Sequence, residues 1–144
     1  MAPEVPMSAT TPPVPKTETE MRTFDPGDPI HVRAQQVWMI LVHHALLKQK
    51  VTYQTLAVMM GFGPDAARVT IKPVAIVAFF CEAHGLPQLN AIVVRKDSGE
   101  PGCHVILGPD GTSDAQEKVF AFDWLHVRVP TPGTFRTLWA EFGG

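Results

Sequence analysis

Apolar side chains recur at helical spacing in the first part of the chain after residue 29. The spacing predicts a helix over residues 32–48. A short extended piece follows at residues 50–52, and Thr52 can cap a second helix over residues 53–60 that ends at Gly61. The inward side of the first helix is expected to carry Trp38, Leu41 and Ala45.

A third helix is predicted to open at residues 63–65. Pro64 suits a first-turn position, and the carboxylate of Asp65 suits the positive end of a helix. Pro73 lacks an amide hydrogen, so it must kink or split this helix. The apolar run after it continues to His84, and Gly85 stops it.

Strand-like segments and turns are predicted after Pro87. Residues 89–95 include three consecutive β-branched residues and predict a strand, followed by a turn at residues 97–102 and a second short strand at residues 103–107. Residues 108–111 are expected to form another turn.

A further strand is predicted at residues 119–122, extending toward residue 127, and a closing helix at residues 134–141. The apolar face of that helix would be Phe135, Leu138, Trp139 and Phe142. The aromatic side chains of this region are expected to be core rather than a base-stacking platform: Phe120, Phe122, Trp124, Phe135 and Trp139.

Residues 1–29 differ from the rest of the chain. They contain seven of the 14 prolines, five acids and two bases, and no apolar periodicity. Such a segment buries too little surface to offset its chain entropy, so we expect a disordered, acidic tail. Residues 30–144 then form one domain, which fits the 144-residue length and the 45% hydrophobic content.

Composition excludes several classes of protein. The net charge is −2, which excludes a polybasic protein, and the longest near-apolar run is too short to cross a bilayer. We see no secretory signal, and two cysteines make no disulfide framework. We therefore expect a cytoplasmic protein of bacterial type, with no membrane partner and no cofactor.

The predicted elements define an α+β fold: three N-terminal helices, a β-hairpin or small antiparallel sheet, and a C-terminal helix. This is the order of a winged helix, in which the third helix enters the major groove and the hairpin flanks it. Five bases and one acid lie between His31 and Ile76, and Arg95 and Lys96 lie at the hairpin tip. Duplex DNA is thus a candidate partner, although solvated helices also carry lysines. The candidate contacts are Tyr53, Arg68, Lys72, Lys48, Lys50, Arg95 and Lys96.

Several segments in order resemble one known family. They are Gln36-Val37-Trp38, then Val51-Thr52-Tyr53-Gln54-Thr55-Leu56-Ala57, then Gly61, then Pro64-Asp65-Ala66-Ala67-Arg68-Val69. They are similar to the DNA-binding domain of the O6-alkylguanine-DNA alkyltransferases and the alkyltransferase-like proteins. The resemblance covers residues 36–70 well and extends loosely to residue 99, and it implies a winged helix.

The resemblance also implies roles for two residues. Tyr53 matches the family's tyrosine beside the nucleotide backbone, and Arg68 matches the arginine that replaces an extruded base in the duplex. A planar guanidinium suits that role because it stacks on bases and donates to the orphan partner. The alternatives are a phosphate contact or an ion pair with Asp65 for Arg68, and a half-buried helix-start aromatic for Tyr53.

The family's nucleophilic cysteine is not matched on the expected strand. Laying residues 89–94 on that motif puts Asn90 at its place, and an amide cannot accept an alkyl group as a thiolate does. A second alignment instead matches Cys103 and His104 to the family's Cys-His pair, at the cost of a long insertion. We expect a binding protein rather than an enzyme, with Cys103 as the nucleophile in the alternative.

The remaining chemistry-bearing residues give weaker indications. A zinc site would use the soft ligands Cys81, His84, Cys103 and His104, but free cysteine is a common core residue. His43 and His44 are expected to be one surface and one core histidine.

Three hypotheses follow. The first is a non-enzymatic nucleic-acid-binding winged-helix protein with a regulatory or damage-recognition role. The second is a protein-interaction module on the same fold, which would use the acidic tail or the C-terminal half. The third is a Cys103-dependent alkyltransferase.

Overall fold

The computed structural model describes residues 23–102 and 111–142, and within these ranges it is a helix-rich α+β structure with one two-stranded sheet. The helices are α3 (Ile30–Leu46), α4 (Tyr53–Met59), α5 (Ile71–Ala83), α6 (Gly111–Ala121) and α7 (Pro132–Phe142). Three 3-10 helices join them: η1 (Pro64–Thr70), η2 (Leu89–Ile92) and η3 (Trp124–His126). The strands are β1 (Val51–Thr52) and β2 (Val93–Val94).

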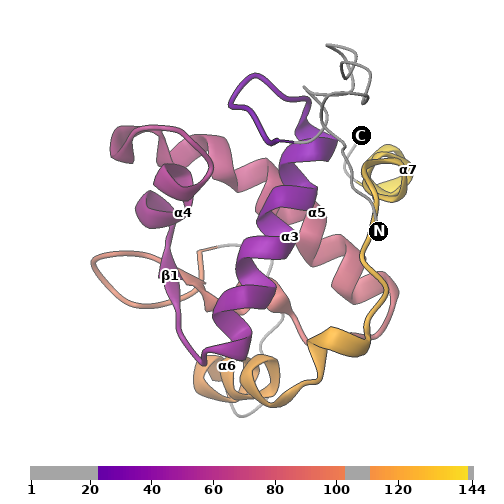
Figure 1. Ribbon diagram of the computed structural model, residues 1–144. Coiled ribbons are helices and arrows are strands. Elements are labelled where there is room, and N and C mark those ends of the chain that lie inside the picture. The colour runs from indigo at the N-terminus through magenta and orange to yellow at the C-terminus, as the bar shows by residue number, and fades with distance from the viewer. Residues whose placement is uncertain (1–22, 103–110, 143–144) are drawn as a thin grey trace, which may run out of the picture.

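Helix α3 runs through the middle of the molecule (Figure 1). Helices α5 and α7 pack against it, and α4 with β1 lies on the opposite side from α7 (Figure 1). One stripe of α3 is fully or almost fully buried, at Ala34, Val37, Trp38, Leu41 and Ala45. These positions are three or four residues apart, as one face of a helix requires, so the predicted first helix and its inward side are confirmed.

Trp38 is the centre of an aromatic cluster in this core. Its ring meets Phe80 of α5 edge to face with centroids 5.2 Å apart, and Trp124 of η3 in the same manner at 5.7 Å. Phe80 in turn contacts Phe135 of α7. The indole of Trp124 donates a 2.7 Å hydrogen bond to the carbonyl of Val119. The prediction that the C-terminal aromatic residues are core is confirmed, because each is buried or packed against the core.

The boundaries predicted for the second helix agree with the structure. The Thr52 hydroxyl accepts a 3.1 Å hydrogen bond from the amide of Thr55 and caps α4, and Gly61 follows α4 with a φ of 95°. The third helix begins at Pro64 as predicted, but its first part is the 3-10 helix η1. It is split at Thr70 into η1 and α5. Pro73 then falls in the first turn of α5, where a missing amide hydrogen removes no helical hydrogen bond.

The sheet differs from the predicted antiparallel one. Strands β1 and β2 are parallel, with Val51 opposite Val93 and Thr52 opposite Val94. An antiparallel bridge joins Val94 to Pro101, so the chain does turn back after β2. The turn at residues 97–102 is confirmed by hydrogen bonds from the amide of Arg95 to Glu100 and from the amide of Gly99 to Arg95.

The strand predicted at residues 89–95 is confirmed only in part, and the strand predicted at residues 119–122 is wrong. Residues 89–92 form η2, and only Val93–Val94 is extended. All these residues are buried, and a fully buried apolar run has no alternation that distinguishes a strand from a helix. The strand predicted at residues 119–122 is instead the end of α6. There Gln116 and Val119 are buried three residues apart, so packing overrides the β propensity of valine and phenylalanine.

Residues 1–22, and with them most of the predicted tail, lie outside the described residues, as do the predicted strand at 103–107 and most of the turn at 108–111. The last part of the predicted tail, residues 23–29, forms a turn beside the domain. The Pro26 carbonyl accepts a 2.6 Å hydrogen bond from Arg33, and the Pro26 ring lies against Gly61. Contacts with the domain therefore begin before residue 30.

The predicted closing helix is confirmed as α7, in which Phe135 and Leu138 are buried and Trp139 is half-buried. In residues 23–102 and 111–142, no helix has both the length and the apolar character that crossing a membrane requires.

Candidate functional site

Three adjoining hollows lie between the start of α5 and the turn after β2. The central one, of about 230 Å³, is lined by Tyr53, Ala67, Arg68, Ile71, Arg95 and Gly102. It shares Tyr53 and Arg95 with a second hollow, of about 570 Å³, that also contains Gln54, Lys96 and Asp97. It shares Arg68 and Ile71 with a third, of about 470 Å³, that also contains Ile30, Arg33, Val69, Lys72 and Pro73. We call these three hollows together the basic groove.

Tyr53 lies at the middle of the basic groove because Thr52 caps α4 just before it. The backbone of Gly102 passes directly against the Tyr53 ring. A Cβ atom at residue 102 would overlap the ring and its hydroxyl, so only glycine fits while the ring keeps this place. The half-buried helix-start aromatic expected at residue 53 is what the structure contains.

Arg68 and Lys72 come from one side of the basic groove. Arg68 is the exposed basic residue of η1, and Lys72 is exposed in the first turn of α5. No ion pair joins Arg68 to Asp65 in the described part of the chain, so the alternative of a surface pair with Asp65 is not what is observed. The Arg68 guanidinium is therefore available to a ligand in the groove.

Arg95 and Lys96 come from the facing side. Both are exposed in the turn that follows β2, and the turn is held by the hydrogen bonds of residues 95–100. The Arg95 guanidinium donates a 3.4 Å hydrogen bond to the carbonyl of Gly102, which keeps it over the turn. The structure thus brings Tyr53, Arg68 and Arg95 to one hollow, although they lie up to 42 positions apart in the chain.

Arg33 belongs to the basic groove, although sequence reasoning counted it only as part of the basic cluster. Its guanidinium lies 5.1 Å from the centroid of the Phe62 ring, and it donates to the Pro26 carbonyl. These contacts orient a side chain that the sequence gives no reason to place beside Arg68. Ile71 and Gly102 were also missed, since neither carries a charge or a hydrogen-bonding side chain.

The basic groove is lined by five bases and by one acid, Asp97. The bases are Arg33, Arg68, Lys72, Arg95 and Lys96. This excess gives the groove a positive potential even though the whole chain has a net charge of −2. Lys48 and Lys50, which were also predicted as contacts, line none of the three hollows; they lie between α3 and β1.

Asn90, which the resemblance aligns with the alkyltransferases' nucleophile, does not line the basic groove. Asn90 lies in η2 with 1% of its surface exposed, and it lines none of the three hollows. Cys103 and His104, the alternative pair, lie outside the described residues. Cys81 is fully buried in α5, and no group of three metal-ligating side chains occurs in the parts of the chain that the structure describes. His44 is buried and its ring is hydrogen-bonded to the Ile40 carbonyl, whereas His43 is exposed, as predicted.

Burial raises the pKa of the Cys81 thiol to about 12, against a smaller opposite effect of a hydrogen bond with the Leu89 backbone. The thiol is therefore neutral and unreactive at neutral pH. Because the folded pKa lies above the ordinary value of 9.0, this side chain contributes its full stability below pH 9.

We expect the free energy of unfolding to fall above pH 9, as the unfolded thiol ionises and the folded one does not. The fall is about 1.4 kcal/mol per pH unit up to the folded pKa. Urea unfolding of wild type and Cys81→Ala between pH 8 and pH 11 measures it, because other groups titrate equally in both proteins. If the free energy of unfolding changed with pH in the same way in both proteins, the fall could not be assigned to the Cys81 thiol.

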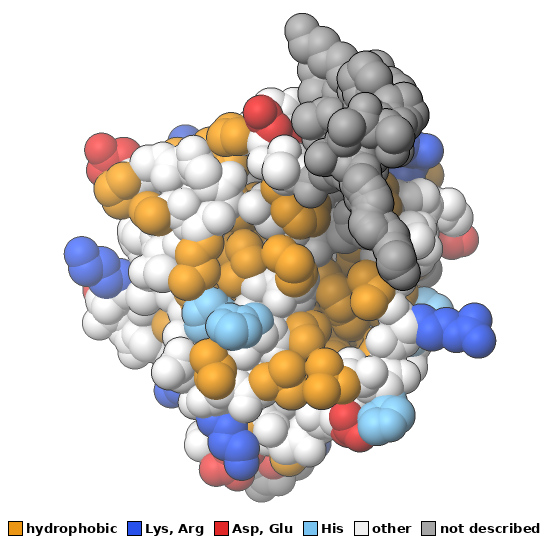
Figure 2. Space-filling view, in the orientation of Figure 1, with side chains coloured by type: hydrophobic (Ala, Val, Ile, Leu, Met, Phe, Trp, Pro, Cys, Tyr) orange, Lys and Arg blue, Asp and Glu red, His pale blue; other side chains and the backbone are white. Residues whose placement is uncertain are grey.

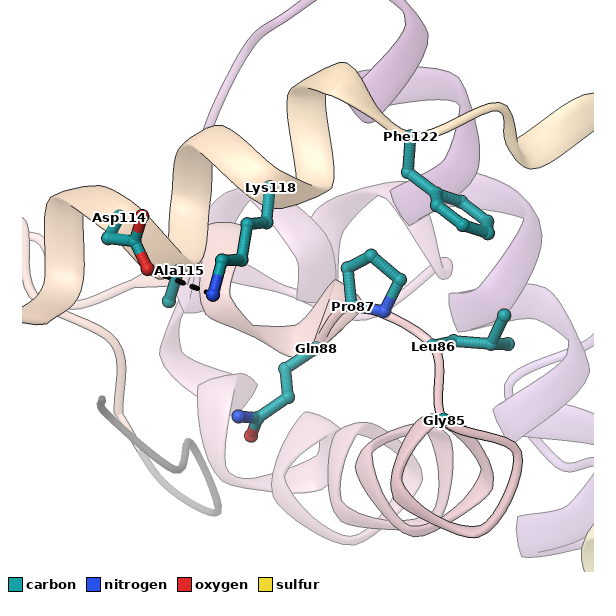
Figure 3. A pocket seen from close by; sticks show the side chains of 8 residues that line it. All are labelled: Gly85, Leu86, Pro87, Gln88, Asp114, Ala115, Lys118 and Phe122. Atoms are coloured by element: carbon teal, nitrogen blue, oxygen red, sulfur yellow. Dashed lines mark ion pairs between the residues drawn. The ribbon is translucent and has the colours of Figure 1, made fainter. Parts of the chain in front are cut away.

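A further hollow, of about 450 Å³, lies between the loop after α5 and helix α6 (Figure 3). Leu86, Pro87 and Phe122 contribute its apolar walls. The Lys118 ammonium lies 3.1 Å from the Asp114 carboxylate, so its charge is compensated within the hollow. This hollow lacks the charge excess of the basic groove, and nothing in its lining specifies a ligand.

Comparison of the chain with protein-family models, with curated proteins and with solved structures found no match. The basic groove therefore has to be interpreted from its own geometry and charge.

Proposed function

We propose that the protein binds duplex DNA through the basic groove, as a non-enzymatic DNA-binding protein of the winged-helix type. The observation that carries the proposal is the meeting of η1 and the start of α5 with the turn after β2 around Tyr53. A winged helix uses the corresponding two elements, the third helix and the hairpin, to contact a duplex.

The side chains of the basic groove suit a nucleic acid. Arginine guanidiniums donate in a planar fork that matches phosphate oxygens, and four of the five bases are exposed: Arg68, Lys72, Arg95 and Lys96. The central hollow adds an aromatic ring and the apolar Ile71, against which a sugar or a base can pack. The resemblance to alkyltransferase-like domains also supports DNA contact by the third helix and the turn after β2.

The proposal is limited to binding because no reachable nucleophile lies in the described part of the groove. Asn90 and Cys81 are buried, and neither lines it. A regulatory or damage-recognition role is compatible with binding of this kind.

We expect the affinity for a short duplex to fall steeply with salt. If the five bases contact phosphates, the slope of log K against log salt is about −4 to −5. Arg68→Ala/Arg95→Ala should reduce the steepness by about two. Fluorescence anisotropy of a labelled duplex at several salt concentrations measures both values.

Lys48→Ala/Lys50→Ala is the matched control, since it also removes two positive charges, but outside the groove. An equal reduction of the salt slope in both double variants would mean that the overall charge, and not the groove, attracts DNA. No binding at low salt would leave the protein-interaction module as the function.

A further inference from the structure

The outward side of α3 lacks the polar character of a solvent-facing helix. No charged side chain occurs in residues 34–47, and the positions opposite the buried stripe include Met39, His43 and Leu46. Met39 and Leu46 are 53% and 46% exposed. A solvent-facing helix side normally carries charged and polar residues, so the exposed Met39 and Leu46 on this side of α3 indicate a partner.

The segment between α6 and α7 extends the same surface. The side-chain amide of Gln35 in α3 donates a 3.4 Å hydrogen bond to the Pro130 carbonyl, which holds this segment beside the helix. Leu125 and Val129 are 73% and 68% exposed there. Figure 2 shows hydrophobic side chains grouped around a histidine over α3, with charged side chains toward the edges. We define the apolar face as Met39, His43, Leu46, Leu47, Leu125 and Val129.

We propose that the apolar face is the interface of a homodimer, in which α3 of one copy packs against α3 of a second copy. The exposed hydrophobic area of the face is large enough for the core of a dimer interface. The five hydrophobic residues of the face present roughly 500 Å² of accessible surface, and a stable interface buries about 800 Å² per partner with an apolar core.

The spacing on α3 also suits a second copy. Met39, His43 and Leu46 are separated by four and three residues, which is the seam that two helices use when they pack along each other. A two-fold interface needs one self-complementary patch, and a helix seam provides it. The imidazole of His43 then lies near the axis, beside its copy.

The interface and the basic groove share no residue. The groove uses residues at the start of α3, at α4, at η1, at the start of α5 and in the turn after β2, whereas the apolar face uses the second half of α3 and the segment before α7. The dimer therefore leaves a groove accessible on each copy. The inference does not rest on DNA binding, and it can fail or hold without it.

The test is the mass of the full chain in solution, by light scattering after size exclusion. We expect twice the 15.8 kDa of the chain, with dissociation on dilution. Leu46→Glu/Leu125→Glu should raise the dimer dissociation constant at least tenfold. Val58→Glu/Met59→Glu is the matched control, because these α4 residues are 51% and 45% exposed outside the apolar face, and it should remain dimeric. Circular dichroism verifies that both variants are folded.

A second measurement avoids introducing charge. His43→Cys in a Cys103→Ser background should form an intermolecular disulfide on mild oxidation, whereas Val58→Cys in the same background should not. A wild-type monomer at the highest soluble concentration would overturn the proposal, as would an unchanged dimer in Leu46→Glu/Leu125→Glu. A monomer that dimerises only after removal of residues 1–22, or that binds phosphatidylglycerol vesicles, would assign the face to the N-terminal segment or to lipid and would also overturn it.

Discussion

Replacement of Trp38 by alanine is expected to lower the free energy of unfolding by about 3–5 kcal/mol. The indole is 3% exposed and lies between α3, α5 and η3. Its removal leaves a cavity that the helices cannot close, and it abolishes the edge-to-face contacts with Phe80 and Trp124. The midpoint of thermal unfolding should fall by roughly 10–20 °C.

Trp139→Ala is the control for this prediction. Trp139 is only half-buried at the edge of the core, where it stacks on Phe79 with centroids 6.0 Å apart. We expect Trp139→Ala to lower the free energy of unfolding by about 1–2 kcal/mol, since solvent can fill part of the vacated space. Urea unfolding followed by circular dichroism measures both variants. Equal losses would show that Trp38 does not hold the three elements together.

Arg68→Ala and Lys72→Ala are expected to affect DNA binding differently, although both residues line the same hollow. Each change removes one charge and should weaken binding to a matched duplex about tenfold at low salt. Arg68→Ala should in addition lose any preference for a mismatched duplex, because an inserted guanidinium acts where a base is easily extruded. Lys72→Ala should weaken binding to both duplexes alike.

Arg68→Lys is the sharper variant, since it keeps the charge and removes the planar fork. We expect near wild-type affinity for the matched duplex and a loss of preference for the mismatched one. Anisotropy titrations with both duplexes in the same salt measure this. Wild-type behaviour on both duplexes would show that Arg68 contributes only a charge.

The N-terminal half of the fold could be predicted because its signals are local. The Thr52 cap, the positive φ of Gly61 and the break before Pro73 all depend on residues within a few positions of one another. The spacing of Trp38 and Leu41 likewise gave the buried side of α3.

The second half was harder because its local signals conflict with its packing. Residues 89–92 are all buried, including the polar Asn90, so the sequence pattern does not distinguish a strand from a helix and their helical turn is decided by the neighbours that bury them. For α6, the residues Gly111, Thr112 and Asp114 do carry a helix-start signal. The β propensity of Val119 and Phe120 instead favours a strand, and the strand predicted there is wrong.

For the candidate site, the sequence by itself determined which residue types could bind: the tyrosine after the Thr52 cap, the bases of the third helix, and the bases of the turn. Their meeting was decided by tertiary structure, since the β1–β2 pairing brings residues 95–102 beside Tyr53. The same pairing sets the backbone of Gly102 against the Tyr53 ring, where only glycine fits. Arg33 joins the groove from the start of α3 through its contacts with Phe62 and Pro26, whereas Lys48 and Lys50 line none of the three hollows. The physical reason is that charge and local propensity belong to single residues, whereas a groove depends on contacts between segments far apart in the chain.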